Sequence, residues 1–322
     1  MARGDVETAR NTFDQAARMV HAPEVELGLV RTYMQAGEYR RALAFAAHAA
    51  GAHREQLPAG SALYAWLLQL DGQGRVAGSM LASAVQEAPQ NLTLQQAAAC
   101  LASPWPSPTP SLMKLPWRTA PYAWGAQVPD ASQVIGSGVV TAQGRVVLAP
   151  ARLMGAARRV WVRNGLGQTV QAEVETALGT EDLVHLRLLQ ALAAPTAPLA
   201  TREPFGGSPG YTVEFATGPA ALASWPLLRA GFLGRVPRSD PLRPLGIEVP
   251  AGPRGGPVFD AAGQLVGMAI SDEASKSLLL PAARFAMAAG ADGPQESPSA
   301  RMQADEIYER SLSSVVQVIV VA

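Results

Sequence analysis

The sequence predicts a multidomain chain of mixed class, with a helical first third and a β-rich remainder. The chain holds 30 glycines and 26 prolines, and both types are sparse before about residue 100 and dense after it. Short apolar runs separated by turn residues recur from Gln133 onward, which is typical of a β-sandwich or β-barrel. The length of 322 residues and the apolar fraction of 48% favour two domains with cores of their own.

Charge and cysteine content argue against several classes of protein. Lys+Arg and Asp+Glu both number 26, so no basic excess indicates nucleic-acid binding. Cys100 is the only cysteine, which excludes an internal disulfide and a thiolate metal cluster. The longest apolar runs are too short for a membrane span. Residues 1–5 lack the apolar core of a signal peptide, but they enter a helical repeat midway, so a removed secretory signal stays open.

Small residues repeat at a fixed interval in the helical part. The first members of the repeat recur 33 residues later: Gly4, Ala9, Phe13 and Ala16 return as Gly37, Ala42, Ala46 and Ala49. A weaker unit covers residues 61–89. This period resembles that of tetratricopeptide repeats, in which small residues let paired helices approach closely. We therefore assign residues 1–102 to such an array; a helical bundle with accidental spacing is the alternative.

Tetratricopeptide arrays usually present a concave face to a peptide or protein. We expect Leu29, Tyr33 and Trp66 to lie on such a face and to contact a partner. Three histidines also lie in this region: His21, His48 and His53. Because no carboxylate or cysteine stands at ligand spacing beside them, we interpret them as surface or packing residues, and we expect no metal site and no cofactor.

A proline-rich segment follows the repeats. Prolines alternate with small residues from Ser103 to Pro110, which predicts an extended, semi-rigid spacer over residues 103–130. A proline-rich docking motif is the functional alternative.

Five motifs in the β-rich part follow one another in the order found in a known enzyme family. They are residues 136–140 (Gly-Ser-Gly-Val-Val), 144–148 (Gly-Arg-Val-Val-Leu), 181–186 (Glu-Asp-Leu-Val-His-Leu), 228–236 (beginning Leu-Arg-Ala-Gly) and 277–281 (Ser-Leu-Leu-Leu-Pro). A loop at residues 251–257 (Ala-Gly-Pro-Arg-Gly-Gly-Pro) stands between the last two. The set resembles trypsin-like serine proteases of the bacterial HtrA/Deg type. The resemblance implies a two-barrel antiparallel β domain, which we place at residues 131–289.

The same resemblance places Arg152 at the general-base position, Asp182 at the orienting acid and Arg254 at the nucleophile. The loop around the nucleophile position keeps three glycines: Gly252, Gly255 and Gly256. Arginine is neither a proton acceptor nor a nucleophile at physiological pH, and losing either member of the triad removes nearly all of its chemistry. Pro253 also removes an amide N–H from the loop, which puts the oxyanion hole in doubt.

Two questions about this site stay open at the sequence level. His185 does not replace the missing base, because it follows Asp182 by three residues on a strand and its side chain faces the other way. Asp182 either pairs with Arg152, Arg254 or both, or the three residues have drifted independently. A carboxylate in a partly buried cleft favours a bidentate cationic partner, so we favour the ion pair.

The C-terminal segment is predicted to be a linker over residues 290–302, followed by a helix and an apolar strand over residues 303–322. This pair resembles the opening of an HtrA/Deg domain, and such a segment is missing before Gln133. Either it completes the first barrel, in cis or by exchange within a homo-oligomer, or it begins a second protease-like domain. Docking is favoured because an unpaired apolar strand promotes aggregation.

These features predict a catalytically inactive pseudoprotease joined to tetratricopeptide repeats, which binds a protein or peptide as a scaffold. The alternative is a serine peptidase with an unrecognised nucleophile, or a degenerate domain of a longer active protease. The resemblance implies a periplasmic or exported protein; a cytoplasmic location is the alternative.

Overall fold

The computed structural model divides the chain into two compact units, Met1–Tyr122 and Ala123–Ala322. It describes residues 5–53, 58–102, 121, 123–155, 159–175, 183–193, 197–200, 202–236, 242–248, 255–271, 276–285 and 300–321. None of the described helices is long and apolar enough to cross a membrane.

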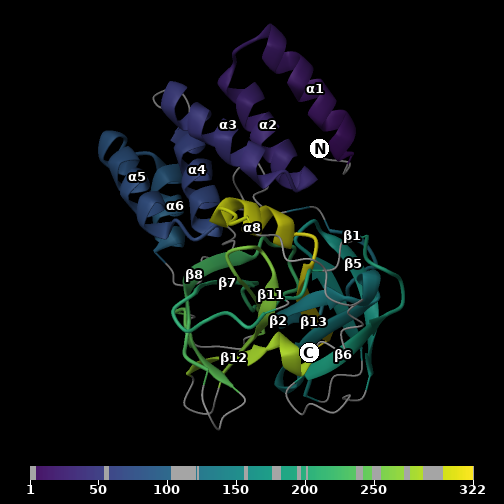
Figure 1. Ribbon diagram of the computed structural model, residues 1–322. Coiled ribbons are helices and arrows are strands. Elements are labelled where there is room, and N and C mark those ends of the chain that lie inside the picture. Colours follow the sequence, from purple (N-terminus) through teal and green to yellow (C-terminus); the bar gives the residue numbers. More distant parts are fainter. Residues whose placement is uncertain are drawn as a thin grey trace. The chain divides into compact units, whose positions relative to one another are not determined.

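The described residues of the first unit form consecutive helices, each packed against the next (Figure 1). They are α1 (Val6–Met19), α2 (Pro23–Ala36), α3 (Tyr39–Ala52), α4 (Pro58–Leu70), α5 (Gly74–Glu87) and α6 (Leu92–Leu101). Gly37 ends α2 in the left-handed conformation, with φ 77°, which glycine adopts without strain. Ala42 and Ala46 are fully buried, as the close approach of paired helices requires.

The first barrel of the second unit combines strands from both ends of that unit. Its sheet has the order β1-β5-β4-β13-β2-β3-β6, and pairing of β5 with β6 closes it. The strands are β1 (Trp124–Gly125), β2 (Ser132–Thr141), β3 (Val146–Pro150), β4 (Val160–Asn164), β5 (Gln168–Glu175), β6 (Leu183–Leu188) and β13 (Val315–Val321). Except for β1, which is parallel to β5, neighbouring strands are antiparallel.

The second barrel closes in the order β10-β11-β12-β9-β8-β7. Its strands are β7 (Pro209–Glu214), β8 (Leu227–Leu233), β9 (Arg243–Gly246), β10 (Pro257–Phe259), β11 (Leu265–Ser271) and β12 (Ser277–Pro281). Three short 3-10 helices follow strands: η1 (Ala142–Gly144), η2 (Ala151–Leu153) and η3 (Ala282–Arg284). The predicted fold class, a helical repeat array followed by two antiparallel barrels, is confirmed.

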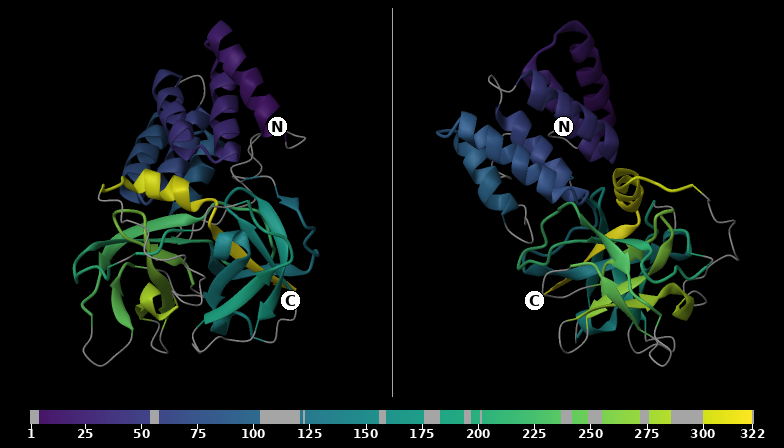
Figure 2. Two further views of the ribbon diagram at one scale, coloured as in Figure 1. Left: turned by 45° about the vertical axis from the view of Figure 1, so that its right-hand side comes forward. Right: turned by 60° about the vertical axis from the view of Figure 1, so that its left-hand side comes forward.

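The C-terminal strand β13 forms part of the wall of the first barrel, where it pairs with β2 on one side and with β4 on the other. Figures 1 and 2 show this yellow strand among the teal strands of the same unit. Val316, Val318 and Val320 belong to the barrel core, while Ile319 packs on the other face against Trp161 and Val134. Helix α8 (Ala304–Ser311) leads into the strand, and its buried Tyr308 donates a hydrogen bond to the carbonyl of Pro226 at 2.8 Å. Docking in cis therefore supplies a central strand of the barrel.

The linker prediction is wrong at its C-terminal end. The second unit begins at Ala123, and the amide of Trp124 donates to the carbonyl of Gly167 at 3.0 Å, which joins β1 to β5. Residues 123–130 thus belong to the β unit rather than to a spacer. The proline-rich core of that prediction, residues 103–120, and residues 290–299 of the second predicted linker lie outside the described residues.

Candidate functional site

The end of strand β3 is where the segments of the predicted triad meet. In the antiparallel pairing of β3 with β6, Pro150 lies opposite Leu183, the residue that follows Asp182. Gly255, the residue after Arg254, packs on the same proline: a Cβ added to Gly255 would lie 2.4 Å from Pro150 Cδ. The described chain neighbours of the acid and nucleophile positions therefore converge on Pro150, two residues before Arg152.

The predicted triad residues themselves are described only in part. Arg152 lies in η2, directly after β3, and its side chain is exposed. Asp182, Arg254 and Gly252 lie outside the described residues. The base position therefore lies at the same end of β3 as Leu183 and Gly255, the described neighbours of the acid and nucleophile positions.

The glycines of the loop are held by close packing and by a buried carboxylate. The Gly256 amide donates to Glu214 Oε1 at 3.2 Å, and a Cβ at Gly256 would lie 1.9 Å from Glu214 Cγ. The Gly256 carbonyl accepts from the Ala269 amide at 2.9 Å, which ties the loop to β11. Beside it, the Ser137 hydroxyl accepts from the Phe215 amide at 2.8 Å, so this buried serine serves as a structural acceptor.

Glu214 is buried next to a second charged side chain, Arg229 on β8. Burial lowers the pKa of the Arg229 guanidinium, and the carboxylates of Glu214 and Glu248 oppose that shift. Within the loop, Gly256 therefore packs on a buried carboxylate, while Gly255 packs on Pro150.

His185 faces away from the interior of the first barrel. Its strand neighbours Val184 and Leu186 belong to the barrel core, so the alternation along β6 turns His185 to the opposite face. Burial lowers the pKa of the His185 imidazole, and the nearby carboxylate of Glu175 partly opposes this. This orientation agrees with the alternation along the strand that the sequence argument assumed for His185.

The predicted binding face of the helical unit is wrong for direct contact with a partner. Leu29, Tyr33 and Trp66 are 1%, 5% and 2% exposed. The Tyr33 hydroxyl donates to Asp14 Oδ1 at 2.9 Å, and both burial and this hydrogen bond raise its pKa. Helical periodicity marks the stripe of a helix that faces the core, and these residues belong to that stripe. Leu29 also lines a pocket.

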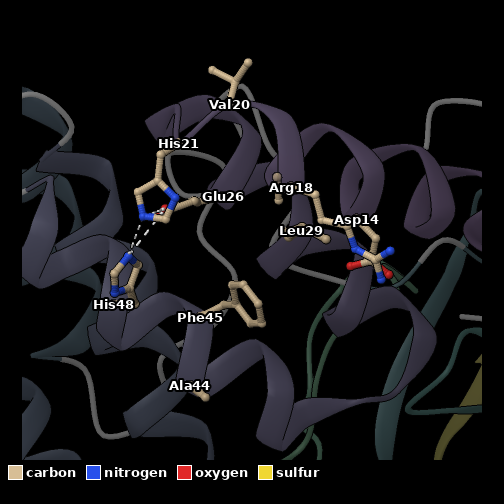
Figure 3. Close-up of a pocket in the computed structure, with 10 residues that line it drawn as sticks. Asp14, Arg18, Val20, His21, Glu26, Leu29, Ala44, Phe45 and His48 are labelled. Atoms are coloured by element: carbon tan, nitrogen blue, oxygen red, sulfur yellow. Dashed lines mark hydrogen bonds and ion pairs between the residues drawn. The ribbon is translucent and has the colours of Figure 1, made fainter.

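That pocket opens between α1, α2 and α3 and has a volume of about 490 Å³ (Figure 3). Its apolar lining includes Val20, Leu29 and Phe45, and its charged lining includes Asp14 and Arg18. Mixed apolar and charged walls on this scale suit a side chain or short peptide.

One wall of the pocket carries a group of residues that the sequence analysis did not bring together. His21 precedes α2, Glu26 lies in its first turns, and His48 lies on α3; their ligand atoms are all within 4.8 Å of one another (Figure 3). His53, the C-cap of α3, contacts the same carboxylate. Sequence reasoning missed the set because Glu26 was not recognised as the shared partner of histidines on other elements.

Comparison with known families follows the same division of the chain. Residues 136–268 match the family model of the trypsin-like peptidase domain, and residues 1–67 match a tetratricopeptide repeat model. The chain joins tetratricopeptide repeats to a trypsin-like peptidase domain. A search of curated proteins gave no match.

Solved structures with similarity to the chain include two proteases and the inactive mutant of a third protein. The HtrA-type protease AlgW with a decapeptide is 15% identical, with a TM-score of 0.41, and the match covers 48% of this chain and 50% of AlgW. A serine endoprotease from Yersinia pestis is 18% identical, with a TM-score of 0.40 and coverages of 52% and 58%. The inactive form of a serine-to-alanine mutant protein from M. tuberculosis H37Rv is 18% identical, with a TM-score of 0.38 and coverages of 50% and 86%.

The chain spans about half the length of AlgW and 58% of the Yersinia enzyme. TM-scores below 0.5 are too low to support an argument about activity. The family matches identify the two units, and the chemistry of this trypsin-like domain has to be argued from its own residues.

Proposed function

We propose that the trypsin-like domain is a catalytically inactive pseudoprotease and that the chain acts as a protein- or peptide-binding scaffold. The observation that carries the proposal is the convergence at Pro150: the neighbours of the acid and nucleophile positions meet beside the base position, yet two of the three positions hold arginine. In this proposal the backbone around the site is retained, but the serine nucleophile and the histidine base are not.

The missing chemistry follows from the properties of arginine. Acyl transfer needs a hydroxyl or thiol nucleophile and a base that accepts its proton. The guanidinium groups of Arg152 and Arg254 stay protonated and provide neither. Ser137 is buried and accepts a backbone hydrogen bond, so it does not serve as a substitute nucleophile.

A fluorophosphonate probe tests this directly, because it labels activated serines. We expect no labelling of the purified chain and no cleavage of casein, with trypsin as the positive control. Labelling of any serine in the second unit would refute the proposal. The double variant Arg152→His with Arg254→Ser is the matched comparison, and we expect it to stay inactive because Pro253 still removes an amide N–H from the loop.

We further propose that Asp182 forms an ion pair with Arg152, Arg254 or both. The convergence at Pro150 supports it, because it brings the neighbours of opposite charges to one strand end. A double-mutant cycle with Asp182→Asn and Arg152→Gln, and a second with Arg254→Gln, measures the coupling. We expect at least about 0.5 kcal/mol in one cycle; purely additive effects in both would exclude the pair.

The scaffold role rests on the tetratricopeptide unit and its pocket. The pocket between α1, α2 and α3 offers apolar walls at Val20 and Phe45 and charges at Asp14 and Arg18, which suits a peptide of mixed character. Phe45→Ala enlarges the pocket and removes an aromatic contact surface, so we expect it to weaken capture of peptides from a library. Val76→Ala on α5, where Val76 is 53% exposed and lies outside the pocket lining, is the control. Equal retention by both variants would exclude the pocket.

We also propose an exported, periplasmic location, supported by the resemblance of residues 131–289 to HtrA/Deg proteases. Fractionation of cells that express the full reading frame tests it, and recovery of the protein in the cytoplasmic fraction would overturn it.

A further inference from the structure

Three histidines of the tetratricopeptide unit point ring nitrogens at one buried carboxylate. His21 Nε2 lies 3.3 Å and His48 Nε2 lies 3.5 Å from Glu26 Oε1, and His53 Nε2 lies 3.4 Å from Glu26 Oε2. The Glu26 side chain is only 4% exposed. Three of the four histidines in the chain therefore gather at a single carboxylate.

The spacing of the first three ligand atoms matches the face of a metal tetrahedron. Zinc is held at about 2.0–2.1 Å by histidine nitrogen and about 2.0–2.2 Å by carboxylate oxygen, so neighbouring ligand atoms around it lie roughly 3.3–3.5 Å apart. The three edges here are 3.3 Å from His21 to Glu26, 3.5 Å from His48 to Glu26, and 3.3 Å between the two Nε2 atoms. An ion seated against this face would be at bonding distance from all three atoms.

Hydrogen bonding among these groups does not account for the whole arrangement. Glu26 Oε2 and His53 Nε2 are buried and lie 3.4 Å apart, but neither atom forms a hydrogen bond within the described part of the chain. Buried charges are normally paired or bind metals, and histidine ring nitrogens are the groups that face this carboxylate. In a hydrogen bond between His21 Nε2 and His48 Nε2, which lie 3.3 Å apart, one nitrogen donates and the other accepts. A cation would instead bind the lone pairs of both nitrogens and the carboxylate together.

We propose that His21, Glu26 and His48 bind a divalent first-row transition-metal ion of the zinc class. Imidazole and carboxylate ligands suit zinc, cobalt, nickel and copper, while magnesium and calcium prefer an all-oxygen set. His53 orients the second oxygen of Glu26, the role that outer-shell partners have in metal sites.

The site would join three elements and leave one position open. His21 lies before α2, Glu26 on α2 and His48 on α3, so the ion would link the first helices of the array. The same three residues line the 490 Å³ pocket, so the fourth ligand would come from the pocket side, as water or as a donor group of a bound peptide. The proposal is independent of the state of the trypsin-like domain.

Titration of the tag-free full chain with Co²⁺ tests the site, because tetrahedral Co²⁺ absorbs strongly in the visible range and octahedral Co²⁺ only weakly. We expect one strongly absorbing Co²⁺ per chain, displaced by Zn²⁺. His21→Ala and His48→Ala should each lower the affinity at least tenfold. These side chains are 71% and 50% exposed, so the substitutions leave the helical core intact, which far-UV circular dichroism verifies. His53→Ala should weaken binding by about 10–100-fold.

Asp14→Asn is the matched control, since it removes a carboxylate from the same pocket without removing a ligand atom. His185→Gln is the second control, because it removes the one histidine outside the cluster. Both should bind Co²⁺ with wild-type affinity. Absence of tetrahedral Co²⁺ absorption in the wild-type chain, or unchanged affinity in the folded His21→Ala and His48→Ala variants, would overturn the proposal.

Discussion

The strand β13 supplies the most quantitative prediction, because its valines stand in two environments. Val318 is fully buried in the core of the first barrel, whereas Val321 on the same strand is 39% exposed. Shortening Val318 to Ala removes two buried carbon groups, about 1.6 kcal/mol at roughly 0.8 kcal/mol each. The cavity left behind adds about 24 cal/mol per Å³, so a void of roughly 50 Å³ brings the loss to about 3 kcal/mol.

Thermal unfolding of the full chain measures this difference. For a unit of this size each kcal/mol corresponds to roughly 2–4 °C, so Val318→Ala should lower the Tm of the β unit by about 6–12 °C. Val321→Ala has the same chemistry at an exposed site and should stay within about 0.5 kcal/mol of wild type. Equal effects of the two substitutions would show that β13 does not occupy the barrel core. Truncation after residue 302 should destabilise the β unit further, since β2 and β4 would both lose a partner.

Three further perturbations separate the roles of individual residues. The pKa of His185 is lower in the folded chain than in the unfolded chain, so the unfolded chain binds the extra proton first as pH falls below about 6.5. The contribution of His185 to the free energy of unfolding should be full above that pH and should fall below it by up to about 1.4 kcal/mol per pH unit, until the folded-state pKa is passed. His185→Gln should remove this contribution in chemical denaturation at a series of pH values. Gly256→Ala should cost about 3 kcal/mol by overpacking against buried Glu214, while Gly78→Ala, with nothing within 4 Å in α5, should stabilise by up to about 1 kcal/mol in the same denaturation assay. Zn²⁺ at a hundred times its Kd should stabilise the helical unit by about 2.7 kcal/mol, and this Tm increase should vanish in His48→Ala; an unchanged increase would contradict the ligand assignment.

The sequence predicted those features that depend on local spacing. The 33-residue recurrence of small residues predicted paired helices, and Ala42 and Ala46 are indeed fully buried. The apolar run after residue 314 predicted a docked strand, but spacing alone does not say which two strands it joins. The same periodicity misled the assignment of Tyr33 and Trp66, because it marks an apolar stripe without telling a core-facing stripe from a partner-facing one.

The histidine cluster lay beyond sequence reasoning for a different reason. His21 and Glu26 are separated by a helix start, and His48 lies on the next helix, 27 residues from His21. No single helical or strand period places these side chains together; only the packing of α2 on α3 does. The ligand set is therefore a tertiary feature, visible once the helices are paired.

The two glycines before β10 are held by packing that does not depend on catalysis. Gly256 is fixed by the carboxylate of Glu214 and by β11, and Gly255 by its contact with Pro150 at the end of β3. A side chain at either position would collide with these neighbours, so both glycines are required by packing whether or not a nucleophile stands beside them. The residue at position 254 carries no such requirement from these contacts. These contacts explain the two glycines by packing alone, and under the proposed function the residues at positions 152 and 254 decide whether the domain is catalytic.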